Sequence, residues 1–224
     1  QSTQVVDIDR DGTNEIVTTN KLTSVGPDPL SSVVTIFNAD GSLRSQRSLG
    51  SIVSFRGSKS DTTFDAKGLF VLARTDTSET EIYVCLENRR SPFALVRLDD
   101  SLNELGTYWH YGHLHGPREI SIAGAQKALL LWGVDDGARD QGLSPSTLVA
   151  LEPSRIVGES EASSTPGFGF PVSRAEIAIL RFPDPDLVVA SKATSSIQRV
   201  EAVTQVSIHV VQVFQTTERL LPGI

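Results

Sequence analysis

The stretch that decides the fold reads Val5-Val6-Asp7-Ile8-Asp9-Arg10-Asp11-Gly12-Thr13-Asn14-Glu15-Ile16-Val17. Three aspartates occupy alternate positions, a glycine follows, and a glutamate comes four residues after the last aspartate. Ca²⁺ takes roughly 6–8 oxygen ligands, and carboxylates at every second position can all point into one loop. The glycine allows the sharp turn that brings the later ligands round. The pattern predicts a calcium site formed by the side chains of Asp7, Asp9, Asp11 and Glu15 and the carbonyl of Thr13.

The same residues allow a second interpretation, because Asp-Gly is a common turn pair and an acidic, solvated β-turn needs no metal. The metal site is favoured, since β-branched apolar residues flank the loop on both sides and indicate a loop between two strands. Four carboxylates so close together would also repel one another without a cation. An EF-hand is not supported: its bidentate glutamate would fall on Thr18, and the flanks favour strands rather than helices.

On residues 7–17 the chain resembles the repeat of the FG-GAP/VCBS family, the blades of integrin-alpha-like β-propellers. The resemblance is strong over roughly residues 4–44 and weaker beyond. There is no clear Phe-Gly…Gly-Ala-Pro signature, so the VCBS-type variant is the closer match. The resemblance implies that the loop binds calcium and joins the first two strands of a blade. It also implies a ring of usually about seven blades, which this chain does not show.

An apolar strand followed in its first three copies by a polar turn recurs along the chain, at residues 32–43, 93–102, 147–156 and 206–214. Another apolar segment precedes each copy, at 16–19, 81–86, 128–132 and 186–191, and segments 118–123 and 175–180 read as first strands of their units. Short strands in repeated groups of four point to a β-propeller, whose blades must stack to be stable. A β-sandwich fits the strand density but not the repeated phrase.

We therefore predict an all-β fold and a single β-propeller domain over residues 1–224, with antiparallel blades of four strands each. About four blades are expected, with approximate boundaries 1–48, 49–111, 112–165 and 166–224. They form either a small closed ring or part of a larger propeller. The acidic loop is not repeated intact at 76–81, 124–127 or 183–186, so calcium is predicted in the first unit only.

A second conspicuous segment, Tyr108–His115, holds three histidines and three aromatic residues. Imidazoles suit Zn²⁺ or Cu²⁺, so the segment could form a transition-metal site or a ligand platform. No fourth ligand is evident nearby, which favours a turn at a blade edge with Trp109 packed between blades. The acidic segment 135–140 could likewise bind a cation, but a solvated turn is the favoured interpretation.

Composition limits the classes of function. A net charge of −7 and a pI near 5.1 argue against a nucleic-acid surface. The apolar runs are far shorter than the ~20 residues of a membrane helix. The single cysteine, Cys85, lies in an apolar segment and is expected to be a structural thiol. Because the chain starts at Gln1 and contains no methionine, we expect a processed or trimmed product, with any signal peptide or membrane anchor outside it. As a separate expectation, the protein is extracytoplasmic: secreted, periplasmic or at the cell surface.

The sequence thus predicts a non-catalytic, calcium-binding module for protein or carbohydrate interaction. No nucleophile elbow, phosphate-binding glycine loop or zinc-protease helix is present. The alternative is a propeller enzyme that acts on polysaccharide, a lyase or a hydrolase, with its site near Trp109–His115. Whether those histidines converge on an open site distinguishes the two hypotheses.

Overall fold

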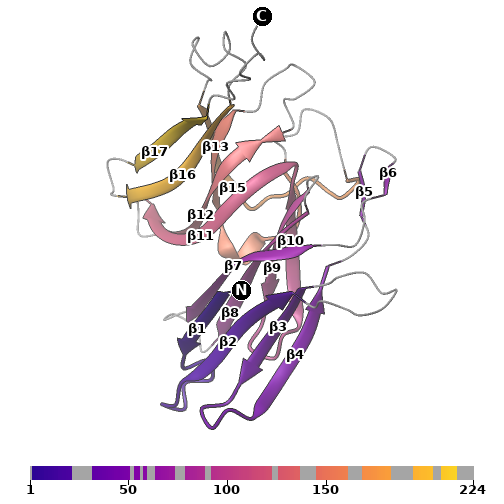
Figure 1. Ribbon diagram of the computed structural model, residues 1–224, viewed down its shortest axis with the longest axis vertical. Helices are drawn as coiled ribbons and strands as arrows, with labels where there is room; N and C mark the ends of the chain where they lie inside the picture. Colours follow the sequence, from indigo (N-terminus) through magenta and orange to yellow (C-terminus); the bar gives the residue numbers. More distant parts are fainter. Residues whose placement is uncertain are drawn as a thin grey trace, which may run out of the picture.

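The computed structural model describes residues 2–21, 32–50, 53–55, 58–59, 64–73, 79–88, 92–122, 126–136, 145–160, 168–182, 194–203 and 208–215 (Figure 1). Over these residues the chain is all β, apart from a short 3₁₀ helix, η2 (Pro153–Arg155). None of them forms a helix long and apolar enough to cross a membrane. The predicted all-β class is confirmed.

The first sheet contains β1 (Ser2–Val6), β2 (Glu15–Lys21), β3 (Ser32–Phe37) and β4 (Leu43–Leu49), in that order and with every pair antiparallel. The acidic loop, residues 7–14, connects β1 to β2. Val6 pairs with Glu15 across this loop, so the two strands leave the loop in register. Strands therefore flank the loop on both sides, as the β-branched residues predict.

The second sheet contains β7 (Asp65–Ala73), β8 (Thr80–Glu87), β9 (Phe93–Leu98) and β10 (Glu104–His110), again antiparallel in chain order. The short strand β14 (Gly158–Glu159) adds a parallel edge to β10. The third sheet contains β11 (Gly112–Ile122), β12 (Gln126–Asp135), β13 (Ser146–Leu151) and β15 (Glu176–Phe182). Two hairpins complete the described structure, β5 (Ser54–Phe55) with β6 (Ser58–Lys59), and β16 (Thr194–Val203) with β17 (Ile208–Gln215).

The three larger sheets stack face to face in chain order, and the second sheet is covered on both sides (Figure 1). Side chains alternate between the two faces of a strand. In β8, Ile82 and Val84 therefore enter the core shared with the first sheet, while Tyr83 and Cys85 enter the core shared with the third. Burial on both faces explains why β8 and its neighbour β9 are apolar almost without interruption.

The third sheet repeats this arrangement. Leu129 and Leu131 of β12 face the second sheet, whereas Leu130 faces the opposite side with Leu148 and Ala150 of β13. The strand β16 lies against β12 and β13. Each layer thus buries the face of the layer before it, and none of the sheets could bury its apolar residues alone.

The strand predictions hold over most of the described chain, with one difference in pairing. The segment 175–180, expected as the first strand of a fourth unit, is β15 and pairs with β13, so it is the last strand of the third sheet. The segment expected at 186–191 lies outside the described residues. Within the part of the chain that the structure describes, the stacked sheets do not close into a barrel or a ring.

Candidate metal centre

The loop between β1 and β2 brings three carboxylates together. Asp7, Asp9 and Glu15 each offer one oxygen, and these oxygens all lie within 4.8 Å of one another. Asp7 directly follows β1, and Glu15 is the first residue of β2, where its side chain is only 3% exposed. The pairing of Val6 with Glu15 brings the ends of the two strands together, so the sheet register itself positions this carboxylate cluster.

Hydrogen bonds within the loop hold two of these carboxylates in place. The backbone N–H of Gly12 donates to Oδ2 of Asp7 at 3.0 Å, and the N–H of Ile8 donates to Oε2 of Glu15 at 2.9 Å. The Ile8 side chain is fully buried in the first core and anchors the loop. Gly12 has a φ of 90°, a left-handed conformation that glycine adopts without steric cost.

Asp11, the fourth predicted carboxylate, does not join the cluster, and the ligand role expected of the Thr13 carbonyl stays a prediction. Oδ1 of Asp11 accepts a hydrogen bond from the N–H of Thr13 at 2.7 Å, and both residues are exposed. This is the local turn that a short acidic side chain makes with the backbone two residues on. The structure thus brings together three of the four predicted carboxylates.

An arginine that sequence reasoning missed completes the cluster. Nη1 of Arg44, in β4, lies 2.7 Å from Oδ2 of Asp9 and 4.0 Å from Oε2 of Glu15. It reaches the loop across the sheet from a position 35 residues away from Asp9. No local pattern could have identified it, because its role depends on strand pairing. With Arg44, the cluster carries a formal charge of −2 (three carboxylates, one guanidinium).

The residues of the cluster fit a hard divalent cation. Oδ1 of Asp7 is buried and has no hydrogen-bond partner among the described residues. A buried oxygen without a partner costs about 1–3 kcal/mol, more when it is charged. An oxygen-only donor set with excess negative charge is what Ca²⁺ prefers, and carbonyls and waters supply its remaining ligands. The geometry therefore leaves a ligand position that a cation would satisfy.

The second sheet has a buried acid near the start of its second strand, as the first sheet does, but satisfies it differently. Glu81 is 1% exposed, and its Oε1 accepts from Nη2 of Arg97 at 2.5 Å. The Tyr83 hydroxyl donates to Oε2 of the same carboxylate. Protein groups thus neutralise Glu81, and in the third sheet the corresponding strand carries Ala128.

The three histidines of segment 108–115 do not converge. His110, at the end of β10, is 1% exposed, and neither ring nitrogen has a hydrogen-bond partner among the described residues. His113, in β11, is half-buried and His115 is exposed. No histidine belongs to a group of potential metal ligands in the described part of the chain.

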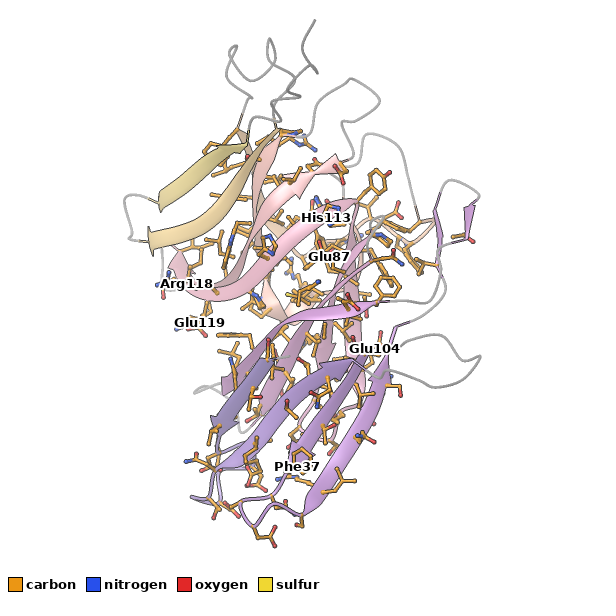
Figure 2. All side chains as sticks on the ribbon, in the orientation of Figure 1. Phe37, Glu87, Glu104, His113, Arg118 and Glu119 are labelled. Atoms are coloured by element: carbon orange, nitrogen blue, oxygen red, sulfur yellow. The ribbon has the colours of Figure 1, made fainter. Side chains whose placement is uncertain are left out.

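Each of these histidines has a distinct environment. Burial lowers the pKa of His110 to about 4. Nδ1 of His113 contacts Glu87, as Figure 2 shows, and its Nε2 lies 3.6 Å from Oδ2 of Asp136. Burial acts to raise the pKa of Glu87, but the hydrogen bond and charge of His113 bring it below the usual range. These contacts are those of a structural junction between the second and third sheets.

Two further predictions concern single groups. Trp109 packs in the core between the first and second sheets, as expected for a residue between layers. The Cys85 thiol donates to the carbonyl of Gly116 at 2.9 Å, and burial raises its pKa, so the thiolate is disfavoured.

In the acidic segment 135–140, Asp135 is buried and its Oδ2 accepts from Nε of Arg181 at 2.9 Å, while residues 137–140 lie outside the described residues.

Comparison of the chain with models of protein families, with characterised proteins and with solved structures gave no match. The resemblance of residues 7–17 to the FG-GAP/VCBS repeat therefore stays a prediction that rests on the loop itself.

Proposed function

We propose that this chain is a calcium-stabilised, non-catalytic binding module of the FG-GAP/VCBS kind, whose sheets are blades of a β-propeller and whose ligand is a protein or a carbohydrate. The observation that carries the proposal is the convergence of Asp7, Asp9 and Glu15 around a buried Asp7 oxygen that lacks a partner. In this proposal Ca²⁺ neutralises the cluster and fixes the β1–β2 hairpin.

The sheet arrangement supports the propeller part of the proposal. Blades of a propeller are four-stranded antiparallel sheets that follow one another along the chain and pack face to face. The first three sheets have this strand order, and the second sheet is buried on both faces. That further blades complete the propeller, and that the blades close into a ring, is part of what we propose.

The weak affinity expected of the site bears on location. Extracellular calcium modules bind with Kd on the order of 10⁻⁴ M or weaker. Arg44 already occupies one side of the cluster and opposes tighter binding. Such a site fills only where free calcium is abundant, so we propose an extracytoplasmic module.

Thermal melting with and without calcium tests the proposal. At a calcium concentration of about 100 times Kd, binding to the folded state alone adds about 2.7 kcal/mol. For a chain of this size, that corresponds to a rise in Tm of roughly 5–10 °C. Asp7→Asn should abolish the rise. Asp40→Asn is the matched control, because Asp40 lies in another Asp-Gly turn of the same sheet and its carboxylate accepts from Ser42 N–H at 2.8 Å. If calcium leaves the Tm unchanged in the parent protein, in Asp7→Asn and in Asp40→Asn, the proposal is contradicted.

A further inference from the structure

A pocket of about 390 Å³ lies between the first and second sheets, away from the acidic loop. Residues 47–50 at the end of β4 form one wall, and Glu104, Thr107 and Trp109 of β10 form the other. Its buried apolar residues are Leu49, Leu86, Val96 and Trp109, and Phe170 also lines it. Ligand pockets for small molecules typically measure about 300–1,000 Å³, so this inter-sheet pocket is large enough for one.

One wall of the inter-sheet pocket is a fixed pair of aromatic rings. The rings of Trp109 and Phe170 stack with centroids 5.7 Å apart and planes at 14°. Trp109 is 7% exposed and packs edge-on against Phe64, whereas Phe170 keeps 39% of its surface exposed. The segment that carries Phe170 is held by the buried Glu159, whose Oε2 accepts from the Phe170 N–H at 3.3 Å. The aromatic surface is thus in place before any ligand arrives, which lowers the entropic cost of binding.

The polar groups of the pocket form a neutral set. Glu104, labelled in Figure 2, accepts hydrogen bonds from Nη2 of Arg47 at 3.3 Å and from Oγ1 of Thr107 at 2.6 Å. Nη1 of Arg47 donates to the carbonyl of Leu102 at 3.0 Å. The formal charges of Arg47 and Glu104 cancel. A ligand with one net charge would therefore meet a like charge as well as an opposite one.

We infer that the inter-sheet pocket binds a neutral carbohydrate. A pyranose ring offers an apolar C–H face, which suits the exposed Phe170 ring, and an edge of hydroxyl groups that both donate and accept. Arg47 retains spare donors and Glu104 retains spare lone pairs, so both can bond hydroxyls that carry no charge. A wholly apolar ligand would leave the remaining donors of Arg47 and the remaining lone pairs of Glu104 buried without partners, which is costly. The volume suits one or two sugar units.

This inference names the ligand for the binding role proposed above and rests on that role, but it does not depend on calcium. The pocket and the acidic loop share no residue. The two sites can therefore fail or succeed separately in experiment.

The test uses the whole chain on an array of neutral oligosaccharides of glucose, galactose, mannose and N-acetylglucosamine, with sialylated and uronate-containing glycans as charged comparators. The neutral glycan with the strongest signal is then titrated calorimetrically. We expect at least one neutral glycan to bind, and Phe170→Ala and Glu104→Gln each to weaken binding at least tenfold.

Matched controls separate loss of the pocket from general damage. Leu105→Ala removes an exposed apolar side chain next to Glu104 that does not line the pocket. Glu152→Gln breaks a surface ion pair with Arg155. Both should bind within twofold of the parent, and melting curves confirm that every variant is folded. Trp109 is left intact because it is part of the core.

Three outcomes would overturn the inference: no neutral glycan binds at millimolar concentration, only charged glycans bind, or Phe170→Ala and Glu104→Gln bind as well as the controls. If calcium raises the Tm while no glycan binds, the pocket inference fails and the calcium module stands. If a neutral glycan binds through the pocket but calcium leaves the Tm unchanged, the calcium module fails and the pocket stands.

Discussion

Arg44 in β4 donates from Nη1 to Oδ2 of Asp9 at 2.7 Å. A strand that lies two positions from β2 in the sheet thus brings a positively charged side chain to the acidic loop. The same nitrogen lies 4.0 Å from Oε2 of Glu15. A metal that binds Asp9 and Glu15 must therefore approach a fixed positive charge or displace it. The guanidinium offsets part of the negative charge of the cluster and would weaken metal binding there.

Replacing Arg44 by Gln should raise calcium affinity. Two unit charges 4 Å apart interact by about 1 kcal/mol in water and more in a partly buried site, so we expect a gain of roughly five- to tenfold. Arg47→Gln is the matched control, because Arg47 lies in the same strand but pairs with Glu104. Calorimetric titration measures both. An unchanged or lower affinity in Arg44→Gln would mean that Arg44 positions the ligands rather than competes with the metal.

The two aspartates at the ends of the predicted pattern should differ. Asp7→Asn removes a cluster carboxylate with a partnerless buried oxygen, and we expect calcium affinity to fall by about a hundredfold or more, enough to abolish the rise in Tm. Asp11→Asn changes an exposed side chain outside the cluster, and the loss should stay within about threefold. Equal losses in calcium titrations of the two variants would show that the loop rearranges to the full predicted ligand set when it binds the metal.

The buried ion pair of the second sheet predicts a large stability effect. Removing one partner of a buried pair typically costs about 3–5 kcal/mol, because the other charge is left uncompensated. Arg97→Leu should therefore destabilise the chain strongly, since Glu81 is fully buried. The double variant Arg97→Leu, Glu81→Gln should recover part of the loss. Urea unfolding measures all three proteins; a single variant that loses less than about 1 kcal/mol contradicts this account.

His110 predicts a pH dependence of stability. Its pKa is lowered from 6.5 to about 4 by burial; the nearby Asp135 and Asp136 oppose this shift, and Arg181 adds to it. Below pH 6.5 the imidazole of His110 is therefore protonated in the unfolded chain, whereas in the folded chain it stays neutral down to about pH 4. Stability from this group is present above pH 6.5 and is lost as pH falls towards 4, by about 3 kcal/mol in total.

The variant that checks this is His110→Leu. It should flatten the stability profile between pH 6.5 and 4, and it should cost little at pH 7, since neither ring nitrogen has a partner among the described residues. Denaturant unfolding at a series of pH values provides the measurement. A variant with the same slope as the parent would assign the acid sensitivity to other groups.

Much of the fold could be predicted because stacked layers leave a strong local signal. Segments 81–86 and 128–132 are apolar almost throughout, since they are buried on both faces, and both are strands. The choice of pairing partner left no such signal: β15 is a largely exposed edge strand, and nothing in its residues says that β13 is its neighbour. Pairing depends on the lengths of connections and on long-range packing.

The candidate site also combines residues that the sequence could predict with residues that only the fold brings in. Asp7, Asp9 and Glu15 are close in sequence, so their spacing was enough to predict the cluster. Arg44 joins it only through sheet pairing, and the exposed turn of Asp11 depends on loop hydrogen bonds. The inter-sheet pocket collects residues 47, 104 and 170, which no sequence window contains together.

The most direct test of the central claim is calorimetric titration of Ca²⁺ into chelator-treated protein. The account predicts one binding event with a stoichiometry near one and a Kd on the order of 10⁻⁴ M, lost in Asp7→Asn. Titration heats no larger than those of dilution, at millimolar protein and calcium, would contradict it and reduce the Asp7–Glu15 loop to an acidic turn.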